Sequence, residues 1–350
     1  MTAITSTEPP PYPYCGQGAD AEDPVGCRGR RPPPPHLQVD ESEPELYERG
    51  LYGACLAHLD GRERHAYLAS LGPGSDLDHR GTRFHSALLD RLLDAVRDPA
   101  DGLPRMGSAE FGAAVFEGEV PLGGATFTGD ARFEEARFRR DADFGEVRFE
   151  GVAGFDWATF GGGAWFETAN FEGVAAFDRA TFESGASFGE AKFERAVRFH
   201  RARFDEMADF DAASFGDAAV FYETAFHGEA LFRRAAFKGD ATFREAAFER
   251  DARFEEAAFE KAARIGPLAC RGTVDLTAAV FSVAVTLEIA AGRVHCRHTH
   301  WASKAALRLR HAVLDLSDAV LEFPMSVAGQ PPSPSTETGC STRPGSPKCR

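Results

Sequence analysis

Phenylalanine recurs through the middle of this chain at alternating spacings of five and six residues. The series begins Phe127, Phe133, Phe138 and continues without a break to Phe259. Ala or Val precedes nearly every Phe by two positions, as in Ala131-Arg132-Phe133. A unit of 11 residues repeated this often is typical of a solenoid, a fold in which each repeat packs only against its neighbours.

The angles between the Phe positions exclude a helix. Repeats of this length also occur in right-handed helical supercoils, but two Phe five residues apart on a helix lie roughly 140° apart around its axis. In a strand, Ala-x-Phe places Ala and Phe on one face and the middle residue on the other. The middle residues are often polar, such as Arg132, Asp143 and Lys192, and Gly, Asp, Glu and Arg between the triplets suit tight turns. The repeat therefore predicts short strands joined by turns.

The same register extends beyond the Phe series on both sides. Upstream it includes Phe111, Phe116 and Leu122, and downstream it includes Ile265, Cys270, Leu276, Phe281 and Leu287. Farther on, apolar residues lie 20 apart, as in Phe281, Trp301 and Leu321. We predict coils of 22 residues followed by coils of 20, which at about 4.8 Å per coil form a rod of roughly 45 Å.

Individual units resemble the pentapeptide-repeat family, whose motif is a small residue, any residue, a central Leu or Phe, and two further residues. Ala136-Arg137-Phe138-Arg139-Arg140 and Ala191-Lys192-Phe193-Glu194-Arg195 fit this motif, and the resemblance covers roughly residues 109–325. The extra residue in every second unit departs from the simplest pattern, as in Phe-rich bacterial members. The resemblance implies an all-β solenoid, a right-handed quadrilateral β-helix with Phe ladders inside.

The rest of the chain divides into three further segments. Residues 1–43 are rich in Pro and are predicted to be a disordered leader. Residues 44–105 are predicted to be a small helical segment that caps the β-helix, because residues 85–96 carry an amphipathic stripe; a partner-binding helix is the alternative. The β-helix is expected over 106–328, and 329–350 is expected to be a disordered tail.

The sequence favours a cytoplasmic location. No apolar segment follows Met1, and no stretch is long enough to span a bilayer. Seven Cys in that setting do not indicate a disulfide framework.

Cys15, Cys27, Cys55 and His58 form the strongest candidate for a metal site. The two-residue gap in Cys55-Leu56-Ala57-His58 lets both side chains reach one ion, and three Cys with one His make a closed structural zinc site. Proteins with similar Phe-rich repeats often carry an N-terminal segment that ends in a comparable Cys-Leu-Ala-His. The alternative is three reduced cysteines in a loose leader. Apart from this zinc, no cofactor is expected.

Acidic residues 22 positions apart are expected to stack in two columns on the outside of the rod. The first column contains Glu134, Asp156 and Asp178, and the second contains Glu150, Glu172 and Glu194. Near the end of the rod, His295 is expected to stack outside between Asp275 and Asp315. The columns are the candidate interaction surface of a chain whose net charge is −15, and that charge disfavours direct binding to nucleic acid.

Two functions are consistent with these features. The first is a non-enzymatic scaffold or protein–protein interaction module, because solenoids present long repetitive surfaces. The second, implied by the resemblance, is a DNA mimic that binds and inhibits a type II topoisomerase such as gyrase. A mixed surface would favour the scaffold, and a continuous negative ridge would favour the mimic. No nucleophile elbow, phosphate loop or metalloprotease motif is present in the sequence, so no catalytic residue is expected. The partner is not identified by the sequence, and a homodimer remains open.

Overall fold

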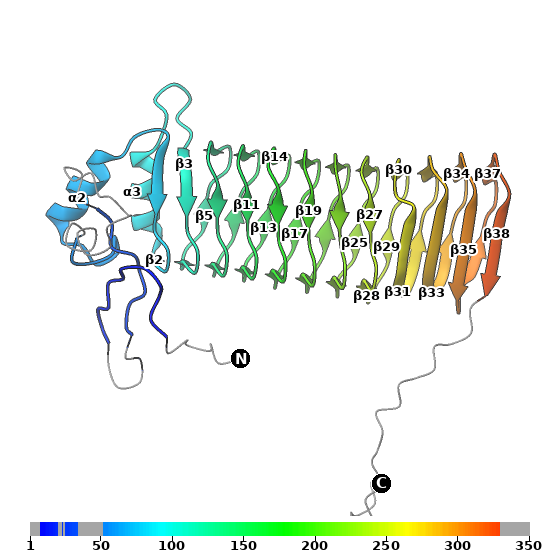
Figure 1. Cartoon of the computed structure of the whole chain (residues 1–350), viewed down its shortest axis with the longest axis horizontal. Helices are drawn as coiled ribbons and strands as arrows, with labels where there is room; N and C mark the ends of the chain where they lie inside the picture. Colours follow the sequence, from blue (N-terminus) through cyan, green and yellow to red (C-terminus); the bar gives the residue numbers. More distant parts are fainter. Residues whose placement is uncertain (1–7, 20–22, 24, 34–51, 330–350) are drawn as a thin grey trace, which may run out of the picture.

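The computed structural model describes residues 8–19, 23, 25–33 and 52–329. Most of them form a straight rod of stacked coils, with two short helices at its N-terminal end (Figure 1). The strands of successive coils pair in parallel, as in β10 with β14. The predicted all-β solenoid with a small helical segment is confirmed.

Each full coil has four sides, and each side contributes one short strand. One coil consists of β6 (Thr126–Phe127), β7 (Ala131–Arg132), β8 (Arg137–Phe138) and β9 (Ala142–Asp143). The next coil begins at β10 (Arg148–Phe149), which pairs with β6 at a distance of 22 residues.

The same four positions recur along the rod. The first side continues through β14 (Asn170–Phe171), β18 (Lys192–Phe193), β22 (Ser214–Phe215), β26 (Ala236–Phe237), β30 (Ala258–Phe259), β32 (Val280–Phe281), β34 (His300–Trp301) and β37 (Val320–Leu321). The second side continues through β11 (Ala153–Gly154), β15 (Ala175–Ala176), β19 (Val197–Arg198), β23 (Ala219–Val220) and β27 (Ala241–Thr242). The third side has β4 (Val115–Phe116), then β12 (Thr159–Phe160), β16 (Thr181–Phe182), β20 (Arg203–Phe204), β24 (Ala225–Phe226) and β28 (Ala247–Phe248). The fourth has β5 (Val120–Pro121), then β13 (Ala164–Trp165), β17 (Ala186–Ser187), β21 (Ala208–Asp209), β25 (Ala230–Leu231) and β29 (Ala252–Arg253).

The coil shortens where two sides merge into long strands. In β31 (Arg264–Asp275) and β33 (Val285–His295), Ile265 pairs with Leu287 but Val274 pairs with Val294, with register shifts between them. The predicted change from 22 to 20 residues per coil is therefore confirmed. The rod then ends with β35 (Ala305–Arg310), β36 (Val313–Asp315) and β38 (Met325–Gly329), beside β34 and β37.

The interior is filled by ladders of Phe rings. Phe138, Phe160 and Phe182 stack with centroid distances of 4.6 and 4.9 Å, and their planes are within 3° of parallel. Neighbouring ladders meet edge to face, as in Phe144 and Phe155 at 5.4 Å and 86°. The small residues two positions before each Phe, such as Ala136 and Ala158, are also fully buried and leave room for the rings. Both arrangements are favourable for aromatic pairs.

The N-terminal end is closed by α2 (Gly61–Ser70) and α3 (Ser86–Ala95). Leu88, Leu89, Leu92 and Leu93 of α3 are buried in one core with the first Phe rings, which confirms the amphipathic prediction. The segment predicted to be helical is mixed, however, because β1 (Ser75–Asp78) and β2 (Arg83–Phe84) pair with β3 (Arg105–Glu110) and β4. The β-helix therefore begins at residue 75 rather than 106, and α3 interrupts its first coil.

The N-terminal segment differs from the prediction of a disordered leader. Residues 8–19 and 25–33 are ordered, and they pair as a hairpin through the antiparallel bridge between Tyr14 and Arg30. Contacts with the first coil hold this hairpin in place. Of the predicted tail at 329–350, Gly329 ends β38, and residues 330–350 lie outside the described residues, as do 34–51. Among the residues that are described, no helix combines the length and the apolar character required to cross a membrane.

Candidate metal centre and outer surfaces of the rod

The N-terminal hairpin brings Cys15 next to Cys27. The Cys15 amide donates to the Gly29 carbonyl at 2.9 Å, and the Cys27 amide donates to the Gln17 carbonyl at 2.9 Å. These bonds pair the two short arms of the hairpin, so cysteines 12 positions apart in the sequence lie side by side.

The turn before α2 supplies the other two side chains. The amides of His58 and Leu59 both donate to the Cys55 carbonyl, at 2.8 and 2.9 Å, so that Cys55 and His58 face the same way. Leu56 and Leu59 are buried and anchor this turn in the cap. The Arg64 guanidinium donates to the carbonyls of the same turn, which fixes its path.

The four predicted ligand residues lie together. The Sγ atoms of Cys27 and Cys55 are 3.7 Å apart. His58 Nδ1 lies 3.4 Å from Cys15 Sγ and 3.5 Å from Cys55 Sγ. All four ligand atoms lie within 4.8 Å of one another.

The contacts within the cluster favour the thiolate form of Cys27. The hydrogen bond from the Cys55 thiol lowers the pKa of Cys27 to about 5, although partial burial acts in the opposite direction. The same bond and burial raise the pKa of Cys55. The Gly29 amide also donates toward Cys27 Sγ at 3.5 Å. A thiolate is the form of Cys that binds a metal.

The hairpin lies against the first coil of the rod through close backbone contacts. The Arg30 amide donates to the Arg80 carbonyl at 2.8 Å, and the Arg30 guanidinium forms an ion pair with Asp78. A Cβ atom on Gly81 would lie 2.4 Å from the Arg28 carbonyl oxygen, and φ at Gly81 is +64°. Only glycine fits such a position without displacing the hairpin. These contacts leave no signal in the sequence, because they join segments about 50 residues apart that carry no shared motif.

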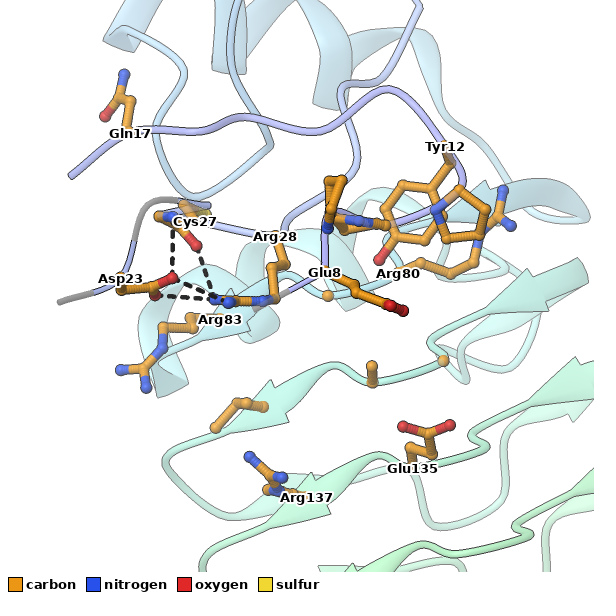
Figure 2. Close-up of a pocket in the computed structure, with 18 of the residues that line it drawn as sticks. Glu8, Tyr12, Gln17, Asp23, Cys27, Arg28, Arg80, Arg83, Glu135 and Arg137 are labelled. Carbon is orange, nitrogen blue, oxygen red and sulfur yellow. Dashed lines mark hydrogen bonds and ion pairs between the residues drawn. The ribbon is translucent and has the colours of Figure 1, made fainter. Parts of the chain in front are cut away.

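A groove of about 870 Å³ separates the hairpin from the first coils. Figure 2 shows its lining, which includes Arg28, Arg80, Arg83 and Arg137. Three of these cations lie in ion pairs: Arg28 with Asp23 at 2.9 Å, Arg80 with Asp78 at 2.7 Å, and Arg83 with Glu117 at 3.1 Å. Because acidic side chains of the protein compensate the charges of these three arginines, the groove is not complementary to an anion.

The first acidic column is partly neutralised. The Asp156 carboxylate accepts a hydrogen bond from the Asp178 amide at 2.9 Å. In the next coil, the Asp178 carboxylate accepts a hydrogen bond from the His200 amide at 3.1 Å. Arg198 lies 2.9 Å from Asp178 and 3.9 Å from Asp156, while Arg132 lies 3.6 Å from Glu134. Burial is the main cause that raises the pKa of Glu134 and Asp156.

The second acidic column is also interrupted by a cation. Arg148 lies 3.2 Å from Glu150 and 2.8 Å from Glu172, while Glu194 is exposed on the following coil. The columns are therefore mixed surfaces of acids and arginines, and not a continuous negative ridge. Near the end of the rod, His295 is in register with Asp275 and Asp315, as predicted, with its Nδ1 3.4 Å from Asp275.

The C-terminal end of the rod exposes apolar side chains that sequence analysis did not single out. They are Val313, Val320, Leu321, Phe323 and Val327, of which Val313 is 70% exposed. A signal for them is visible in the sequence, since residues 312–329 contain no Lys or Arg.

Comparison with known proteins agrees with this architecture. Residues 133–181, 166–214, 188–232 and 221–265 each match the family model described as pentapeptide repeats, in 9 copies. These overlapping matches lie in the middle of the Phe ladders. No curated protein and no solved structure matches the chain. Residues 133–265 therefore match the pentapeptide-repeat family, and the same repeat pattern and four-sided parallel solenoid continue on both sides of this stretch.

Proposed function

We propose that this protein is a non-enzymatic, cytoplasmic scaffold that associates with a second copy of itself through the open C-terminal end of its rod. The observation that carries this proposal is the difference between the two ends. The N-terminal end is covered by α3 and its four buried leucines, whereas β36, β37 and β38 expose large apolar side chains. Reduced thiols at Cys15, Cys27 and Cys55 suit a cytoplasmic location.

The last coil lacks the usual protection of a sheet edge. Exposed edges are normally blocked by Lys, Pro or inward-pointing charge. Here the three acids of the last coil face the preceding coil: Asp315 lies 3.7 Å from Arg297, Asp318 lies 3.9 Å from His298, and Glu322 lies 2.7 Å from His300. Besides these acids, Ser317, Pro324 and Ser326, the described edge carries apolar side chains and backbone groups. Such an edge favours pairing with another strand.

A second copy suits this edge better than a contact along the sides. Two copies related by a two-fold axis would bring the same apolar side chains and strand edges together, which makes the interface self-complementary. An end-to-end arrangement also keeps the bodies of two chains, each with net charge −15, far from each other. A side-by-side dimer would bring acidic surfaces together.

Light scattering of the full chain after size-exclusion chromatography tests the proposal. The expected mass is twice the 37.9 kDa of one chain. Leu321→Asp and Val327→Asp should give monomers, because both side chains are already exposed and the rod itself does not depend on them. Met207→Asp is the matched control, since Met207 is an exposed apolar residue on the side of the rod. A wild-type chain that is monomeric at micromolar concentration would overturn the proposal, as would a Met207→Asp variant that dissociates equally.

DNA mimicry by the acidic columns is the less favoured function. Arg132 and Arg198 lie within ion-pair distance of acids in the first column, and Arg148 lies within ion-pair distance of acids in the second, so the negative potential is broken on each. The mixed surface supports the scaffold.

A further inference from the structure

We propose that Cys15, Cys27, Cys55 and His58 bind one zinc ion, which fastens the N-terminal hairpin to the cap of the rod. The site lies at the opposite end of the rod from the coil proposed for self-association, so either proposal can fail without the other.

Three distances between the four ligand atoms match a tetrahedral zinc site, and all four atoms lie within 4.8 Å of one another. Zinc–sulfur bonds of about 2.3 Å and zinc–nitrogen bonds of about 2.0–2.1 Å place two sulfurs about 3.8 Å apart, and sulfur and nitrogen about 3.5 Å apart. The Cys27–Cys55 sulfur distance is 3.7 Å, and the two sulfur–Nδ1 distances are 3.4 and 3.5 Å. A disulfide would need about 2.0 Å between the two sulfurs. The cluster is therefore spaced for an ion between its members.

The donor set selects the metal and its role. Three thiolates and one imidazole in a tetrahedron favour zinc over magnesium or calcium, which prefer oxygen ligands. Because the protein supplies all four ligands, there is no open position for water or substrate. The ion would therefore be structural.

The backbone of the hairpin passes close to Cys55, and a glycine at position 29 makes this approach possible. A Cβ atom on Gly29 would lie 2.7 Å from both Cβ and Sγ of Cys55. The Gly29 amide also donates toward Cys27 Sγ, a contact that orients the sulfur and stabilises its charge. The absence of a side chain at Gly29 therefore lets the Cys55 thiol lie next to the thiols of Cys15 and Cys27.

The hairpin has backbone and ion-pair contacts but little apolar core of its own. Among the described residues from 8 to 33, Val25 and Pro32 are the only buried apolar residues, and the tyrosines and cysteines of this segment are half-buried. Small segments without an apolar core are commonly held by a metal or a disulfide. Zinc would join the two hairpin arms to the Cys55 turn, and so connect three separate pieces of chain. This also keeps the hairpin in place as one wall of the groove against Arg80 and Gly81.

Metal analysis of the full chain, purified under reducing conditions without added metal, tests the site. We expect one zinc per chain. Replacement by Co²⁺ should give the visible absorption of a tetrahedral cobalt site together with thiolate-to-cobalt charge transfer. His58→Cys should keep one metal and strengthen the charge-transfer band, because a fourth thiolate replaces the imidazole. Cys55→Ser should lose stoichiometric metal, whereas Cys296→Ser, which changes a buried Cys near the other end of the rod, should keep it.

Limited proteolysis gives a second readout that does not depend on metal content. Removal of zinc by a chelator should expose the hairpin to trypsin after Arg28 and Arg30, while the β-helix stays resistant. His58→Ala should show the same cleavage without chelator, and because His58 is exposed the substitution itself should not unfold the cap.

Three outcomes would overturn the proposal. The first is a reduced chain with no stoichiometric zinc and no tetrahedral cobalt spectrum. The second is zinc that persists unchanged in Cys55→Ser. The third is a Cys27–Cys55 disulfide, detected by alkylation and mass spectrometry in freshly prepared protein, since that would make the pair a covalent staple.

Discussion

Within the ladders, an inward Phe contacts the equivalent Phe of the coil before it and of the coil after it. Phe193, for example, lies between Phe171 at 4.7 Å and Phe215 at 5.3 Å, and it is 1% exposed. Its neighbour Lys192 points outward and is exposed. Phe193 therefore contributes to the stability of the core and Lys192 does not, because side chains alternate between the two faces of a strand.

Truncation of Phe193 should be costly and truncation of Lys192 should not. We expect Phe193→Ala to lower the free energy of unfolding by roughly 3–5 kcal/mol, as for other buried aromatic residues. Lys192→Ala should change it by less than about 0.5 kcal/mol. Urea unfolding followed by circular dichroism measures both. Equal losses for the two variants would mean that the strand faces are assigned wrongly.

Elements differ in how far the sequence predicts them. The Phe ladders, the shorter coils after residue 275 and α3 follow from local periodicity, and the structure has all three. β1 and β2 could not be read in this way, because α3 and the loop after it separate Phe84 from Phe116 by 32 residues and break the count of 22. The hairpin depends on pairing between segments without a repeat, and composition alone suggested disorder.

The four candidate metal ligands could also be predicted only in part from the sequence. Their residue types and the gap between Cys55 and His58 are visible in the sequence, but their proximity depends on the hairpin and on its contact with the cap. The arginines that neutralise the acidic columns depend on side-chain reach across coils. Arg198, which contacts Asp178 and Asp156, lies 20 and 42 residues from them.

The cap contains one titrating group that should make its stability depend on pH. His79 is buried between Tyr67, Phe84 and Phe111, and its Nε2 lies 3.3 Å from the Tyr67 hydroxyl. Burial lowers its pKa to about 4. Between pH 6.5 and 4 the unfolded chain binds a proton that the folded cap does not, so stability falls as the pH falls. The full effect is about 3 kcal/mol.

Hydrogen exchange of the α3 amides at pH 7 and pH 5, corrected for intrinsic rates, measures this effect. His79→Gln should reduce the loss of protection at pH 5 relative to wild type, and the comparison of the two chains cancels other titrating groups. His65→Gln is the control, because His65 is exposed on α2. The assignment fails if wild type and His79→Gln lose the same protection.

At the scale of the whole molecule, ion pairs between coils determine how the acidic charge is presented. The rod has a net charge of −15 but no continuous negative ridge along its two acidic columns. We therefore expect the full chain to leave DNA supercoiling by purified gyrase unchanged at micromolar concentration. The informative partner variant combines Arg132→Ala, Arg148→Ala and Arg198→Ala, because it removes the cations that interrupt both columns. Inhibition by the wild-type chain would instead support mimicry.

The charge of the molecule also predicts how self-association responds to salt. Two chains of charge −15 repel each other, and added salt screens this repulsion over a Debye length of about 10 Å at 0.1 M. The proposed joint contains apolar side chains, whose association does not depend on ion pairs across the interface. The dimer dissociation constant, measured by sedimentation, should therefore stay constant or fall as salt rises from about 0.05 to 0.5 M. Leu321→Asp adds charge at the joint, so any remaining dimer of that variant should depend much more steeply on salt. A wild-type dimer that dissociates as salt rises would require ion pairs between copies and would contradict an apolar joint.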